Sequence, residues 1–410
     1  WDANPQVIDN ALAAGSRHGL IATLVDDFIA GPDHYLAAAA DKGRWLRTAP
    51  GPRIILVGGS NVAFSMDCKI LEDRYGLAPV NMGLQARLGP RFMTRQVVDQ
   101  VREGDVVIVM MEHLAMYRGP DGAMSARVEF GRVCPELVQY FDPEQEPPSL
   151  FRTALPRWIS AKAYADHHAL ADLAANTRSN VEILWFGASD GAPAADLTNM
   201  NDAVAEAQKA EQARRDAEFS RRVRPLLTAA QERFVARDRV YLRSGFNRYG
   251  DMTRHLVETP YDPRHIRDFP TDFGPGADSS IRHSIALLNA FANRCRDAGA
   301  AIYFGHPPLR RSRETEGFAV EYETILEKQL DIPILFPIEN SFVGVDDLYD
   351  TNSHLNWHGI TKRMTVLCNG LDRHLTPQID LSVAEQIAAR DRAVRRTIVA
   401  ANPEAAARLH

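Results

Sequence analysis

Three polar residues in two distant stretches of the chain have the side chains that nucleophilic chemistry at a serine requires. Ser60 follows a pair of glycines directly after the apolar run Ile54–Val57. Asp350 and His354 stand in a polar loop near the C-terminus. A serine hydroxyl is a weak nucleophile at neutral pH, so a histidine must take its proton and a carboxylate must fix the tautomer of that histidine. These residue types predict a triad in which Ser60 attacks, His354 is the base and Asp350 orients it.

The elements that would position this triad follow from the apolar pattern. Apolar runs without polar alternation indicate strands that are covered on both faces, as in a parallel sheet. Segments with helical spacing separate these runs, which is typical of βαβ units and predicts an α/β fold with a parallel sheet of about five strands. Parallel strands present their carboxyl ends on one side, so the two stretches can meet there. The predicted strands are Arg53–Val57, Pro79–Gly83, Asp105–Glu112, Ala300–Gly305 and Ile332–Phe336.

The remaining patterns divide the chain into a core and its additions. We expect the α/β core to comprise residues 51–117 and 281–375. Residues 1–50 have helical patterns and are expected to form an N-terminal helical segment, and 376–410 a C-terminal helix. Residues 118–280 lack a sustained period and include a highly charged helical stretch. They predict a large, mainly helical insertion that acts as a lid or a substrate-binding subdomain.

The composition argues against several classes of function. Of the 410 residues, 45% are hydrophobic and 24% are charged, as in ordinary globular proteins. The net charge of -6 gives no reason to expect nucleic acid as a partner. No apolar run is long enough to span a bilayer. The four cysteines are scattered without a CxxC pair, which argues against a zinc cluster, whereas disulfides and free buried thiols are both compatible with the sequence.

Further motifs give no sign of a cofactor or a metal. The glycine pair before Ser60 lacks the third glycine of a dinucleotide fingerprint, and there is no G-K-S/T phosphate loop. His354 and His358 stand at helical spacing, as some metal-binding pairs do. No glutamate occupies the H-E-x-x-H position and no third ligand is evident nearby. We therefore expect neither group.

Three short motifs give the sequence a resemblance to the SGNH (GDSL-type) hydrolases and acyltransferases. Gly58-Gly59-Ser60 resembles the block around the family's nucleophile, with glycine in place of the usual aspartate. Asn81-Met82-Gly83 resembles the second block, and Asp350-Thr-Asn-Ser-His354-Leu-Asn356 resembles the last one. The resemblance implies a three-layer α/β/α, flavodoxin-like fold and a reaction through an acyl-serine intermediate.

The resemblance also implies an oxyanion hole, the set of hydrogen-bond donors that stabilises the negative oxygen of the tetrahedral intermediate. Its donors would be the backbone amides of Ser60 and Gly83, with help from Asn61. The sequence departs from the family pattern at the third block, where Glu112 and His113 stand in place of the expected asparagine donor.

A second departure concerns the acid, because Asp350 precedes His354 by four residues rather than the usual three. We still assign the acid to Asp350, since Asp346 and Asp347 are more remote in sequence. Four further polar residues are candidates for contacting substrate. They are Glu112, His113, Asn247 and Asn356.

The altered third block resembles a divergent bacterial branch of the family that handles acyl groups on cell-surface polysaccharides, and Phe246-Asn-Arg-Tyr-Gly-Asp251 looks like a segment of that branch. The resemblance implies a carbohydrate substrate carrying acyl groups, with acetyl as the expected one, and a membrane-bound acyltransferase as partner. It also implies an extracytoplasmic location, in the periplasm or at the cell surface. The chain begins at Trp1, which is compatible with an N-terminal tether that precedes it.

Two functions of different classes fit the sequence. The first is a serine O-acyltransferase or esterase, and the sequence does not choose between transfer to a sugar hydroxyl and transfer to water. The second is a catalytically silent member that binds glycan or scaffolds an acylation complex, which the altered third block and the shifted acid would favour.

Overall fold

Runs of branched apolar residues form the centre of the fold as a four-stranded parallel sheet. The strand order is β2-β1-β3-β4, and all neighbours are parallel. This confirms the predicted α/β class and four of the predicted strands. They are β1 (Arg53–Gly58), β2 (Ala78–Asn81), β3 (Val106–Met110) and β4 (Ala301–Phe304).

The computed structural model describes residues 34–141, 240–257 and 276–401, and also 266, 269–271, 273 and 274. All of these except His34 belong to one unit, made of Tyr35–Gln145 and Val240–His410. This unit is wider than the predicted core, because it includes residues from both ends of the predicted insertion. The middle of that insertion and most of the predicted N-terminal segment lie outside the described residues.

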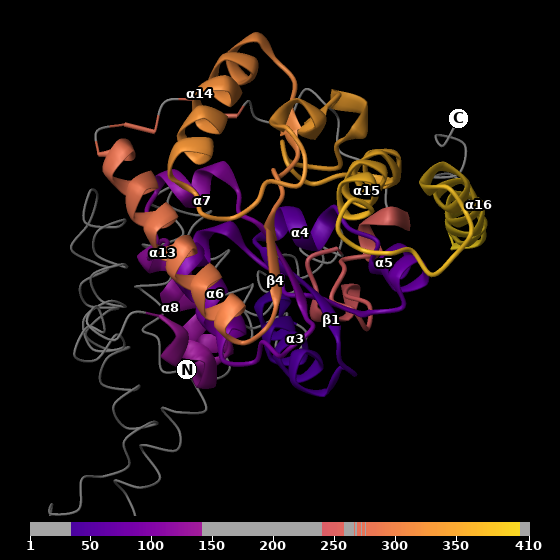
Figure 1. Ribbon diagram of the computed structural model, residues 1–410, viewed down its shortest axis with the longest axis horizontal. Coiled ribbons are helices and arrows are strands. Elements are labelled where there is room, and N and C mark those ends of the chain that lie inside the picture. Colours follow the sequence, from indigo (N-terminus) through magenta and orange to yellow (C-terminus); the bar gives the residue numbers. More distant parts are fainter. Residues whose placement is uncertain are drawn as a thin grey trace, which may run out of the picture. The chain divides into compact units, whose positions relative to one another are not determined.

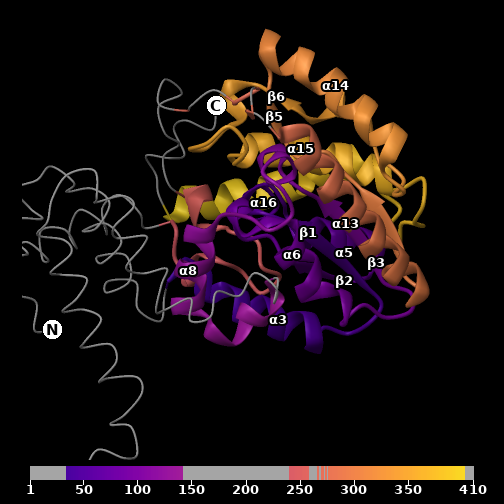
Figure 2. The same cartoon turned by 90° about the vertical axis from the view of Figure 1, so that its left-hand side faces the viewer.

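The fifth predicted strand, Ile332–Phe336, is present only as a short extension of the sheet. Ile334 forms a single parallel bridge with Phe304 of β4, supported by two backbone hydrogen bonds. A separate two-stranded parallel sheet was not expected from the sequence. It consists of β5 (Leu309–Arg310) and β6 (Phe342–Val343) and lies at the same end of the unit as α14, opposite α3 (Figures 1 and 2).

Alternate strand residues enter two different apolar cores, because successive side chains of a strand point to opposite faces. Ile55 and Val57 pack into the first core, and Ile54 and Leu56 into the second. The first core is covered by α3 (Ala38–Thr48), α6 (Gly89–Val98), α13 (Ala277–Asp297) and α14 (Arg313–Gln329). The second is covered by α5 (Cys68–Tyr75), α15 (Trp357–Leu371) and α16 (Val383–Ala401). Figure 1 shows α6 and α13 on one side of the strands and α5, α15 and α16 on the other, an arrangement consistent with three layers.

Short helices complete the described part of the chain. Three are α-helical, namely α4 (Ser60–Phe64), α7 (His113–Tyr117) and α8 (Met124–Val133). The 3-10 helices are η2 (Tyr35–Ala37), η3 (Ala86–Leu88), η4 (Pro135–Tyr140), η8 (Arg243–Gly245), η9 (Arg254–Val257), η11 (Ile338–Ser341) and η12 (Val345–Asp347).

The structure bears on the state of the cysteines and on the question of a membrane-spanning helix. All four cysteines are buried and unpaired, so of the two alternatives the structure has free thiols. In the described ranges, no helix combines the length and the apolar character that crossing a membrane requires.

A buried ion pair joins the first strand to the start of the third. The Arg53 side chain is completely buried, and its guanidinium bonds the carboxylate of Asp105 through two nitrogens. Arg53 also donates to the backbone carbonyls of Leu46 and Gln100. Since its carboxylate also accepts the backbone N–H of Arg53, Asp105 ties the amino ends of β1 and β3 together.

Replacing Asp105 with alanine should lower the free energy of unfolding by about 3–5 kcal/mol, because it leaves a buried guanidinium without its counter-charge. Chemical denaturation measures this change. Asp99→Ala is the matched control, since the Asp99–Arg294 pair is mostly exposed and should contribute less than about 1 kcal/mol. Equal effects of the two substitutions would contradict the assignment of Arg53–Asp105 as the stabilising pair.

Candidate active site

Ser60 stands at the carboxyl end of β1, as its place after an apolar run predicts. It is the first residue of α4, and the two preceding glycines fill a turn too crowded for side chains. A Cβ atom at Gly58 would lie 2.3 Å from the carbonyl oxygen of Met110, and one at Gly59 would lie 2.4 Å from both carboxyl oxygens of Glu112. The glycine pair is therefore required by close packing against the end of β3.

The loop before α15 holds Asp350 and His354 against each other. His354 Nδ1 lies 2.8 Å from Asp350 Oδ1, so the expected pair is present. The Tyr349 N–H donates to the His354 carbonyl at 2.8 Å, and this bond closes the loop so that its two ends face each other. The backbone N–H of His354 donates to Thr351 Oγ1 at 3.0 Å. A separation of four residues thus suits this closed loop.

Ser60 and His354 are connected through Phe64, which sequence reasoning missed. The His354 ring stacks on the Phe64 ring with centroids 4.1 Å apart and an interplanar angle of 8°. Phe64 stands one helical turn after Ser60 on α4, so the same short helix carries the serine and supports the histidine. That spacing was a usable signal, because residues four apart share a helix face.

Tyr241 is a second residue that the sequence did not reveal. Its hydroxyl donates to Asp350 Oδ2 and lies 3.1 Å from His354 Nδ1. It belongs to the segment 240–257, which the sequence pattern assigns to the large, mainly helical insertion. No motif or periodicity indicates it, since only the fold brings this segment next to the triad.

The surroundings of Asp350 keep it ionised. Burial alone favours the neutral acid, but the attraction of His354 and the hydrogen bonds from His354 and Tyr241 outweigh it, so the pKa of Asp350 lies below its usual value. An ionised Asp350 can orient the His354 ring and stabilise its protonated form.

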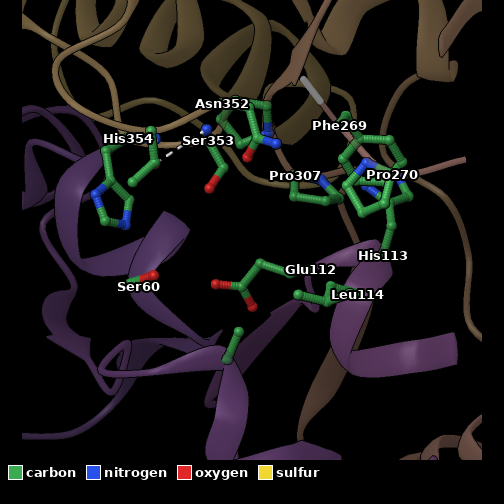
Figure 3. Close-up of a pocket in the computed structure, with 13 residues that line it drawn as sticks. Ser60, Glu112, His113, Leu114, Phe269, Pro270, Pro307, Asn352, Ser353 and His354 are labelled. Atoms are coloured by element: carbon green, nitrogen blue, oxygen red, sulfur yellow. Dashed lines mark hydrogen bonds between the residues drawn. The ribbon is translucent and has the colours of Figure 1, made fainter. Parts of the chain in front are cut away.

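Ser60 and His354 line one pocket, and Figure 3 shows them around the same open space with Glu112. Its walls combine polar loop residues with apolar and proline side chains. The other lining residues are Ala86, Glu112, His113, Leu114, Phe269, Pro270, Pro307, Pro308, Thr351, Asn352 and Ser353. The predicted strand-end pair Glu112 and His113 is thus at the site.

Two of the expected oxyanion donors are engaged elsewhere, which corrects the sequence-based assignment. The backbone N–H of Gly83 donates to Asn81 Oδ1 at 2.9 Å. The Asn61 side chain is completely buried and donates to the Met110 carbonyl at 3.2 Å. Its backbone N–H donates to Glu112 Oε1. Of the three expected donors, the backbone N–H of Ser60 remains, and its role in an oxyanion hole stays a prediction.

Two of the four substrate-binding candidates have structural roles instead. Asn247 Oδ1 accepts the N–H groups of Tyr249 and Asp251, which closes a turn. Asn356 is the N-cap of α15, and its Oδ1 accepts the Gly359 N–H at 3.1 Å. Neither asparagine lines the pocket. Turn-closing and capping asparagines cannot be told from ligand-binding ones by residue type alone.

His113 forms part of the pocket wall as a buried, neutral ring. It packs edge-on against Phe269, Phe318 and Tyr322. Burial lowers the pKa of His113 to about 3, so the ring is uncharged at neutral pH.

The low pKa of His113 predicts a loss of stability in acid. The unfolded histidine takes up a proton below about pH 6.5, whereas the folded one stays neutral down to about pH 3, so its contribution is complete above pH 6.5 and declines as the pH falls. Between pH 6.5 and pH 5 the decline should be about 2 kcal/mol. Urea titrations at both pH values should show a smaller pH difference for His113→Leu than for the wild type. An equal difference would contradict this account.

Across the described residues, no three His, Cys, Asp or Glu side chains are grouped so that they could hold a metal ion. Comparison of the chain with protein-family models, with curated proteins and with solved structures finds no match.

Proposed function

We propose that this protein is an SGNH-type serine O-acyltransferase or esterase that works through an acyl-serine intermediate. The observation that carries the proposal is the arrangement of Ser60 and the His354–Asp350 pair around one pocket at the carboxyl edge of the sheet. The strand order and the bridge at Ile334 support the finer proposal of a flavodoxin-like fold, in which Ile332–Phe336 occupies the fifth strand position.

The proposed reaction has two halves. In the first, Ser60 Oγ attacks the carbonyl carbon of an ester, and His354 Nε2 takes the serine proton, while Nδ1 stays bonded to Asp350. The intermediate collapses, His354 gives the proton to the departing alcohol, and the acyl group stays on Ser60. In the second half, an alcohol or water gives its proton to His354 and attacks the acyl-serine. The bond from the carbonyl carbon to Ser60 Oγ then breaks, and His354 returns the proton to Ser60 Oγ as the new ester or free acid leaves.

The walls of the pocket favour an alcohol as the acceptor. Phe269, Pro270, Pro307 and Pro308 lie along it and present little hydrogen-bonding capacity to water. A site that limits water slows the competing hydrolysis of a reactive acyl-enzyme. We propose acyl groups of a cell-surface or periplasmic polysaccharide as substrate, with a membrane-bound acyltransferase as partner. These last assignments, and the extracytoplasmic location, rest on the family resemblance of the motifs.

A catalytically silent, glycan-binding or scaffolding role is the alternative. The engagement of Gly83 and Asn61 in other hydrogen bonds favours it, because an enzyme of this type needs more than one oxyanion donor.

A serine-directed fluorophosphonate distinguishes the two functions. The wild-type protein should be labelled at Ser60 and should hydrolyse p-nitrophenyl acetate, and Ser60→Ala should abolish both. Ser279→Ala, which changes an exposed serine on α13, is the control and should leave both unchanged. A wild-type protein that is neither labelled nor active would exclude the enzyme and leave the silent role.

Tyr241→Phe tests the contact between Tyr241 and the triad. It removes a hydrogen bond to an ionised carboxylate, which typically contributes about 1.5–3 kcal/mol, so kcat should fall at least about tenfold. KM should stay near the wild-type value, because Tyr241 does not line the pocket. Tyr140→Phe, which changes a half-buried tyrosine packed on Phe92, should leave kcat unchanged. An unaltered kcat in Tyr241→Phe would show that the hydroxyl does not support Asp350.

A further inference from the structure

Glu112 is a buried carboxyl group at the centre of the proposed site. The residue is 7% exposed and lines the pocket with Ser60. Among the described residues, no lysine or arginine forms an ion pair with it. Burial without a counter-charge disfavours the ionised form of a carboxyl group and favours the protonated one. Burial is the largest influence and raises the pKa of Glu112, whereas backbone hydrogen bonds and the charge of a protonated His354 oppose the rise in part.

The hydrogen bonds of Glu112 restrict where that proton can point. Oε2 accepts the Gly59 N–H and Oε1 accepts the Asn61 N–H, both at 3.0 Å. Both partners are donors, so neither can accept the O–H of a neutral carboxylic acid. The two bonds fix the carboxyl group beside the residue between them, which is Ser60. Figure 3 shows the Glu112 carboxyl group directed toward Ser60.

We infer that Glu112 works as a neutral acid whose O–H donates to the oxyanion formed when Ser60 attacks an ester. This inference rests on the proposed function. Glu112 then supplies the donor that the asparagine of the third block supplies in the resembled family. The proton stays on Glu112 throughout, and the negative oxygen accepts the hydrogen bond until the intermediate collapses. An ionised Glu112 would instead repel the developing oxyanion.

The other titratable groups around Glu112 are compatible with this role. His354 lines the same pocket, and only its protonated form lowers the pKa of Glu112, whereas the proposed reaction needs a neutral His354 to accept the serine proton. His113, its neighbour in sequence, is uncharged because burial lowers its pKa to about 3. Tyr35 of η2 is the third titratable neighbour; burial raises its pKa well above the usual value, so it is neutral, and its hydroxyl donates to the Leu84 carbonyl. A polarised acid of this type, kept neutral by an apolar site, is an established form of oxyanion donor.

The pH dependence of kcat/KM tests the inference through two substitutions. The wild-type value should fall at alkaline pH, where Glu112 loses its proton. Glu112→Gln keeps an N–H donor that does not titrate, so this alkaline fall should disappear. Its activity at neutral pH should be reduced about tenfold, since the amide nitrogen cannot accept the second backbone N–H. Glu112→Ala removes the donor and should reduce kcat by about 10²–10³. An alkaline fall that persists in Glu112→Gln, or near-normal activity of Glu112→Ala, would overturn the inference.

A spectroscopic measurement separates this inference from the proposed function. The infrared difference spectrum of wild type minus Glu112→Gln at neutral pH should contain the C=O stretching band of a protonated carboxylic acid. If Ser60 reacts with a fluorophosphonate but the spectrum contains carboxylate bands instead, the inference fails and the proposed function stands. If Ser60 does not react, both fail, whatever the state of Glu112.

Discussion

The parallel register of β1 and β3 is the constraint on which the site depends. Gly58 pairs with Met110, so the two strands end side by side. Ser60 and Glu112 each follow two residues after this pair, and they leave the sheet at the same edge. The backbone amides that flank Ser60 then bond the Glu112 carboxyl group, which holds the turn and the strand end together. A register shift of one residue would separate them, because strand side chains alternate between faces.

Asp350 and His354, the other residues of the site, lie in a loop that is fixed at both ends. Leu348 and Leu355 form an antiparallel bridge across its base, and Asn356 caps the helix that follows. Within the loop, Thr351 accepts the His354 N–H. These local bonds hold Asp350 and His354 against each other in the structure, which is the preorganisation that the proposed acid–base role requires. Tyr241 adds a bond from a segment that is distant in sequence.

The sequence predicted the parts of the fold that depend on local pattern. The strands were visible as apolar runs because β1 and β3 are covered on both faces. The association of Ser60 with His354 followed from the shared edge of a parallel sheet. The short contribution of Ile334 was not predictable, since its length is decided by packing against β4. Hydrogen-bond partners were the hardest feature to predict from the sequence. The polar groups of Asn61, Gly83 and Asn247 could each face a ligand or a neighbouring group of the protein. The contact of Tyr241 with Asp350 could be found only from the three-dimensional fold.

The stacking of His354 on Phe64 has a consequence for how the site tolerates movement. Since α4 carries both Ser60 and the ring that supports His354, a small rigid displacement of this helix would move the supporting ring together with Ser60. The distance between Ser60 and the His354 ring would then change little when the edge of the sheet moves. A sliding movement of the loop that carries His354 across the Phe64 ring would instead change this distance, because α4 would not move with the loop. The flat contact between the two rings is therefore the plane along which the site would most easily come out of alignment.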